Sequence, residues 1–193
     1  MQELKFYFGL GWEHITEWGA LDHQLFILAL AALYLFKDWK KVAILVTAFT
    51  IGHSITLALS VLDIFKLNDT LVEFLIPCTI VVTAAANIFI KEDAKAPIQI
   101  NYFLALLFGF IHGMGFANAI RFMLVKDESL GLGLFGFNLG LEVGQLLVVA
   151  IILLVAELVV SIFHVKRRNW ILVISASVIS VAFMMIYDRI KFL

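Results

Sequence analysis

The feature that most constrains the fold is a series of long apolar stretches with few charges inside them. A helix needs roughly 20 apolar residues to cross a hydrocarbon layer of about 30 Å. By that rule the sequence predicts six membrane-spanning helices, at about 19–36, 42–62, 70–90, 98–121, 133–163 and 169–187. Only short connections remain, so we expect an all-α integral membrane protein, with a single transmembrane domain over residues 1–193 folded as a compact bundle.

Composition excludes several other classes of protein. With 63% hydrophobic and 15% charged residues, the chain is unsuited to a soluble domain. A net charge of −1 and the lack of a basic domain argue against nucleic acid as a partner, and the lipid bilayer is the expected surrounding. The one cysteine, Cys78, cannot form an intrachain disulfide or a thiolate cluster.

The first 18 residues differ from the rest. They mix charged residues with Phe6, Trp12 and Trp18, and are too polar to span a membrane. Aromatic residues of this kind gather at the membrane surface. We therefore expect an N-terminal interfacial or re-entrant helix.

Basic residues predict the orientation of the bundle. The densest basic clusters are KDWKK at 37–41 and HVKRR at 164–168, both on the same side of the predicted bundle. Loops rich in Lys and Arg stay on the cytoplasmic side. The sequence therefore predicts a multi-pass protein with both termini outside.

Polar residues from five predicted helices fall in the same outer leaflet. Because ionisable groups at membrane depth are costly, they are usually paired or bound to something. The residues are Asp22, His23, His53, Glu73, His112, Asn138 and Glu142. Nothing in the helix assignment requires this agreement, so it predicts one shared site.

Local spacing supports the site in two places. Asn138, Glu142 and Gln145 follow the i, i+4, i+7 rule and form one polar stripe. Pro77 has no N–H for the carbonyl of Glu73, which frees a backbone oxygen suited to a cation.

Small residues predict where helices approach closely. The predicted helices 98–121 and 133–163 carry glycines four residues apart, namely Gly109, Gly113, Gly136, Gly140 and Gly144. We expect these two helices to contact each other there.

The chemistry of these side chains indicates a metal. Imidazole nitrogen with carboxylate oxygen suits divalent zinc, nickel, cobalt, iron or manganese, whereas the lack of paired Cys or Met argues against Cu(I). A bound divalent cation would let these groups stay deprotonated in a dry place.

Five short segments in order resemble the HupE/UreJ-like membrane proteins: HITEWGALDHQLF, IGHSITLAL, EFLIPCTIVVTAAAN, FIHGMGFA and FNLGLEVGQ. The His…Asp-His segment followed by Gly-His-Ser is also similar to the signature of the nickel/cobalt permeases. The resemblance implies a bacterial inner (plasma) membrane protein that handles nickel, cobalt or a related metal. By motif, the metal-handling positions are His14, Asp22, His23, His53, Glu73, His112, Asn138 and Glu142.

The first histidine departs from the family pattern. Seven residues separate His14 from Asp22, two more than in that pattern. On a continuous helix, two residues turn a side chain by about 200°. His14 therefore reaches the site only if the chain breaks near Gly19, and otherwise Glu17 stands in for it.

Three functions fit these residues. The first is a secondary transporter or permease for a divalent transition metal. The second is an intramembrane zinc-dependent hydrolase that uses the same His/Asp cluster, and the third is a membrane module that binds metal without transport. The family resemblance favours transport over catalysis, so we do not expect an enzyme.

Overall fold

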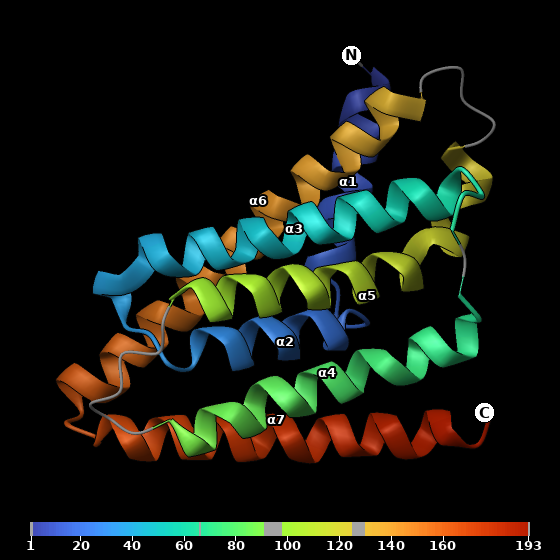
Figure 1. Ribbon diagram of the computed structural model, residues 1–193. Helices are drawn as coiled ribbons and strands as arrows, with labels where there is room; N and C mark the ends of the chain where they lie inside the picture. The colour runs from blue at the N-terminus through green and yellow to red at the C-terminus, as the bar shows by residue number, and fades with distance from the viewer. Residues whose placement is uncertain (1, 66, 91–97, 125–129, 193) are drawn as a thin grey trace.

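The computed structural model describes residues 2–65, 67–90, 98–124 and 130–192, and these ranges form helices and their connections (Figure 1). The long helices are α1 (Gln2–Thr16), α2 (Leu21–Ala31), α3 (Trp39–Val61), α4 (Asp69–Phe89), α5 (Ile98–Leu124), α6 (Leu130–Glu157) and α7 (Arg167–Ile190). A 3-10 turn, η1 (Phe36–Asp38), precedes α3, and a π-helical turn, η2 (Leu158–Ile162), ends α6.

Length and composition identify the candidate membrane spans. Within the described ranges, four helical segments are long and apolar enough to cross a membrane: Phe36–Val61, Asp69–Phe89, Leu130–Ile162 and Arg167–Ile190. The helices Leu21–Ala31 and Asn101–Ala117 are apolar but shorter. The prediction of an all-helical membrane protein is thus confirmed, and four of its six expected spans reach full length.

The largest difference from the expected boundaries concerns the first span. Instead of one helix over 19–36, α2 ends at Ala31, where the N–H of Tyr34 bonds to its carbonyl at 2.9 Å. Leu35 is extended and leads into η1. The carboxylate of Glu157 accepts the N–H of Phe36 at 3.3 Å, so α6 helps to hold this early end of the first apolar stretch.

The helices pack mainly in pairs, and their buried faces form two apolar clusters (Figure 1). The closest pairs are α3 with α5, α1 with α6, and α4 with α7. Figure 1 shows α2 enclosed between these pairs, which agrees with six buried residues in its eleven. Phe26 of α2 packs there against Phe49 of α3, with 4.9 Å between ring centroids.

The two glycine rows face different partners. On α5, a Cβ atom at Gly109 would collide with the backbone oxygen of Phe49, and one at Gly113 with that of His53. The α5 row therefore packs on α3.

The α6 row packs on α1. A Cβ atom at Gly140 would collide with the backbone oxygen of Phe8, while at Gly136 and Gly144 it would lie 3.1 Å from Leu4 and 3.4 Å from Ile15. The predicted glycine contact between α5 and α6 is therefore wrong. A glycine row shows that a flat face exists, but its spacing says nothing of which helix covers that face.

Arginines of α7 hold both ends of α4. Arg168 donates to the backbone oxygens of Ile88 and Ile90, which are at the C-terminal end of α4. At the other end Arg189 donates to the carbonyl of Glu73, the oxygen that Pro77 leaves without an N–H partner. The freed carbonyl does bind a cationic group, but that group is a guanidinium of the same chain.

Candidate metal centre

The site begins at the break between α1 and α2. α1 ends at Thr16 and α2 begins at Leu21. The side-chain amide of Gln24 bridges the gap, because its Nε2 atom donates to the carbonyls of Ile15 at 3.0 Å and Glu17 at 2.9 Å. This is the break near Gly19 that the spacing of His14 requires.

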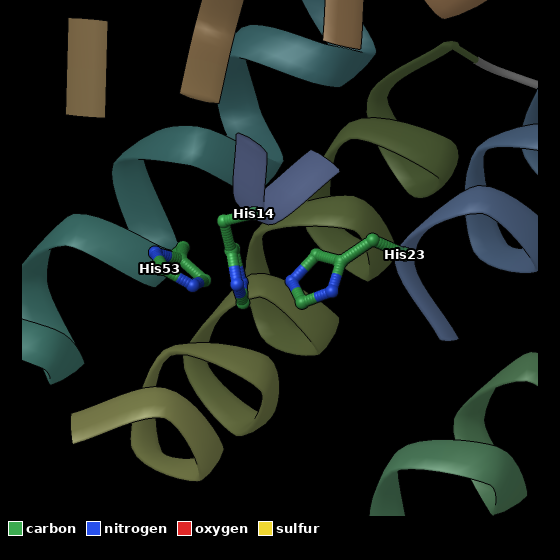
Figure 2. Close-up of side chains that lie close together, drawn as sticks. All are labelled: His14, His23 and His53. Atoms are coloured by element: carbon green, nitrogen blue, oxygen red, sulfur yellow. The ribbon is translucent and has the colours of Figure 1, made fainter. Parts of the chain in front are cut away.

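Because of that break, three histidines from three helices meet. One ligand nitrogen from each of His14, His23 and His53 lies within 4.8 Å of the other two. Figure 2 shows the three rings side by side, and their centroids form a triangle with sides of 4.6, 5.8 and 6.2 Å. His53 is fully buried, His23 is 3% exposed, and His14 is half-buried. The three imidazoles thus form a compact group at the break between α1 and α2.

Asp22 orients one of these rings. Its Oδ1 atom accepts the backbone N–H of His23 at 2.8 Å and lies 3.1 Å from His23 Nδ1. A carboxylate on one ring nitrogen leaves the other nitrogen free to bind a metal, as is usual for histidine ligands. His23 Nε2 is therefore the nitrogen available to the group.

Several nitrogens of the group lack hydrogen-bond partners. Among the described residues no partner reaches Nε2 of His14, Nε2 of His23, or either nitrogen of His53. Buried polar atoms are nearly always hydrogen-bonded, and leaving one without a partner costs roughly 1–3 kcal/mol. One nitrogen of each histidine thus lies close to the other two, and a ring nitrogen that makes no hydrogen bond can give its lone pair to a metal ion.

His112 adjoins the group from α5. Its ring centroid lies 5.0 Å from that of His23. Its Nε2 atom is 3.3 Å from the hydroxyl of Thr79 on α4, and its Nδ1 atom has no partner in the described part of the chain. His112 thus lies beside the three-histidine group without belonging to it.

The polar residues of α6 lie in different surroundings. Asn138 lies beside His53, yet its Nδ2 donates to Leu134 O at 2.8 Å and its Oδ1 has no partner among the described atoms. Glu142 lies further along α6, where it accepts a hydrogen bond from Thr47 of α3 at 2.6 Å. A metal role for Glu142 therefore stays a prediction.

Two other carboxylates lie apart from the group. The side chains of Glu73 and Glu17 are exposed, and the described metal-ligand group includes neither. Glu17 is not needed as a substitute, because His14 itself reaches the other histidines. A metal role for Glu73 stays a prediction.

Aromatic rings close the site, and the sequence reasoning missed them. The ring of Phe116 lies 3.9 Å from that of His14, Phe49 lies 5.9 Å from His23, and Phe137 lies 6.3 Å from His53, all between centroids. With 18 phenylalanines in the chain, no spacing rule singles out these three. Only the positions of the helices do so.

Fold and site together define a helical membrane protein with a buried histidine group of the kind that binds transition metals. A comparison with protein families gives the particular family. The family described as HupE / UreJ protein matches residues 1–189, and the chain belongs to it. Neither the comparison with curated proteins nor that with solved structures gave a match.

Proposed function

We propose that this protein is a secondary transporter or permease for a divalent transition metal, of the nickel/cobalt type or zinc. The observation that carries the proposal is the group of His14, His23 and His53, whose unpartnered nitrogens meet inside a membrane protein. Neutral imidazole suits divalent nickel, cobalt and zinc. Family membership, which is linked with metal handling, supports the same class of cargo.

The three histidines serve as the primary ligands in this proposal. Asp22 fixes His23 from the opposite ring nitrogen, and Asn138 and His112 adjoin the site as further donors. Three protein nitrogens leave coordination positions open to water or to a fourth side chain. A site of this kind can bind an ion and release it, which transport requires.

The path of α1 supports a six-crossing topology. α1 runs beside α6 from Gly136 to Gly144, inside the candidate span Leu130–Ile162. α1, the break and α2 then form one discontinuous crossing, with α5 as the other crossing beyond the four full-length spans. In this arrangement α1 enters the membrane as the first half of a crossing, so it is neither an interfacial nor a re-entrant helix. Discontinuous helices of this type place ion sites within the membrane in many transporters.

We place the protein in the bacterial inner membrane with both termini outside. The basic clusters at 37–41 and 164–168 then face the cytoplasm. The histidine group lies toward the outer side, where it would receive the ion first.

The hydrolase alternative has less support. A metal-dependent hydrolase needs a general base near the metal-bound water. In the described part of the chain the carboxylate in contact with the histidines is that of Asp22, which already bonds to His23. Phe49, Phe116 and Phe137 also enclose the site, which suits a small ion better than an organic substrate.

The test combines metal analysis with transport. The purified protein and a His23→Ala/His112→Ala double variant are analysed for nickel, cobalt and zinc. Uptake of the ion found is then measured in proteoliposomes. Stoichiometric metal that is lost in the double variant, with accumulation above protein-free vesicles, is the expected result. Bound zinc without accumulation would favour a non-transporting role, and no bound metal in the series would overturn the metal site itself.

A further inference from the structure

A cavity of about 60 Å³ lies between α2, α4 and α5, away from the histidine group. Its wall is largely apolar, but three polar side chains contribute to it, Thr83 and Asn87 of α4 and Asn101 of α5. A water molecule needs at least about 10–15 Å³ of such space and two or more polar partners. The cavity is therefore large enough to hold water. The donors of its three polar side chains bond to Thr79, Ala29 and Tyr34, so water there would meet mainly their oxygen atoms.

The cavity lies on the same helix faces as His112 and Thr79. On α5, Asn101, Ala105 and Phe108 line it, at spacings of four, three and four residues that continue to His112. Residues three and four apart share a helix face. The α5 face that carries His112 next to His23 is therefore the face that borders the cavity.

On α4, too, the face next to His112 borders the cavity. Thr79 contacts His112 Nε2 at 3.3 Å, and the hydroxyl of Thr83, one turn on, donates to Thr79 O at 2.8 Å. Thr83 in turn lines the cavity. A ring contact between His23 and His112, followed by the hydrogen bonds of Thr79 and Thr83, thus connects the histidine group with the α4 wall of the cavity.

Beside these contacts, two aromatic rings lie between His112 and the cavity. Phe108 lines the cavity, and its ring centroid lies 5.8 Å from that of Phe26. Phe26 lies in turn 5.5 Å from His112. These two side chains are the apolar barrier between the histidines and the cavity.

The seam between α3 and α6 is a weaker candidate for a path. Thr50 and Gln145 are buried there and directly bonded at 2.8 Å, so they fill the seam. The next pair, Thr47 with Glu142, has an exposed threonine that faces the outside of the bundle. This seam leads toward lipid, whereas the face shared by α4 and α5 leads to open space.

We propose that the cavity between α2, α4 and α5 is the inner vestibule of the ion path, which takes a hydrated divalent cation from His112 once Phe26 and Phe108 move apart. The proposal rests on the transport function proposed above. The vestibule lies at the end of the bundle where α2 ends and α7 begins, next to the basic clusters that predict the cytoplasmic side.

The test uses cysteine labelling in a Cys78→Ala background, which removes the native thiol. Thr83→Cys and Asn101→Cys are placed singly in the vestibule wall. Phe103→Cys is the matched control, because Phe103 lies on α5 but is 62% exposed on the outside of the bundle. A charged methanethiosulfonate reagent is applied to inverted membrane vesicles and to intact cells, and uptake and bound metal are measured before and after labelling.

We expect both vestibule cysteines to react in inverted vesicles and Phe103→Cys to stay unlabelled. Labelling should lower uptake at least about tenfold relative to the same variant before labelling, because a charged adduct narrows the path. Bound metal should not change, since the histidine group is untouched. If one vestibule variant loses its metal before labelling, that variant is misfolded. The result for the other vestibule variant then tests the proposal.

Two outcomes overturn the proposal and tell its failure from that of transport. If the unsubstituted protein accumulates metal but the vestibule cysteines are unreactive, or react without loss of uptake, only the vestibule is wrong. A lipid chain in the cavity would give the unreactive result. If the unsubstituted protein accumulates no metal, the proposed transport function is wrong. The vestibule proposal, which rests on it, is then wrong as well.

Discussion

His23 is the residue on which the candidate metal centre depends most, because its ring lies beside those of the other histidines. Its ring lies within 5.0 Å of those of both His14 and His112, and its Nδ1 atom contacts Asp22. We expect His23→Ala to lose nearly all bound metal in elemental analysis of the purified protein, because it removes the central nitrogen donor. His164→Ala is the control, since His164 is exposed in the connection before α7. Equal loss in both variants would show binding unrelated to the site.

Asp22 is expected to act on the metal through His23 rather than as a ligand. Removing a carboxylate that orients a ligating histidine typically weakens metal affinity about 10- to 100-fold. Asp22→Asn should therefore retain metal at high concentration and lose it on dilution, as measured by competition with a chelator. If Asp22→Asn loses as much bound metal as His23→Ala in the same competition, the carboxylate itself binds the ion.

Residue types and motif order predicted the three histidines that meet in the candidate site. His14, His23 and His53 were all candidates, and the break required for His14 is present. Which of the candidate residues meet and which only lie nearby could not be predicted, because that depends on side-chain directions at helix crossings. Glu142 shows this: its stripe with Asn138 is regular, yet it bonds to Thr47 of another helix.

Among the elements, the pairing of α1 with α6 holds His14 in place. Gly140 is packed against the backbone of α1, whereas Gly131 on the same helix has nothing within 4 Å of a Cβ. Gly140→Leu should lower the melting temperature in detergent, because overpacking a tight contact typically costs about 1–3 kcal/mol. It should also lower bound metal, since α1 carries His14.

Gly131→Ala provides the comparison for that variant. Replacing an open helical glycine with alanine should leave the melting temperature unchanged or raise it slightly, because alanine is the better helix former by about 1 kcal/mol. A Gly140→Leu protein with unchanged melting temperature and metal content would contradict the close approach of α1 to α6.

Most helix positions followed from apolar length alone. α3, α4 and α7 begin and end within three residues of the predicted 42–62, 70–90 and 169–187. Partner choice did not follow, because neighbouring helices in lipid are equally apolar and only close packing distinguishes them. The short α2 was also missed, since no Pro or Gly marks its end in the sequence AALYLF.

For the molecule as a whole, bound metal should crosslink helices and so stabilise the folded state. The three histidines come from α1, α2 and α3, so an ion at the group joins all three. A ligand at 100 times its dissociation constant stabilises the folded state by about 2.7 kcal/mol. The melting temperature should therefore rise with added metal and saturate.

His14→Ala is the variant that tests this stabilisation by metal, because His14 is only half-buried and its loss leaves a small gap. We expect its melting temperature to respond much less to metal than that of the unsubstituted protein, measured over the same concentration series. An equal response would place the stabilising ion somewhere else.

The contact between α1 and α6 also has a consequence for the order of assembly. α1 ends at Thr16, whereas its packing surface on α6 begins beyond Leu130. Chains are made from the N-terminus at about 5–20 residues per second, so the first helix to leave the ribosome waits several seconds for its partner. Until α6 is inserted, His14 has no fixed position. The metal centre would therefore be among the last parts of the protein to mature, and nascent chains should bind no ion tightly before that point.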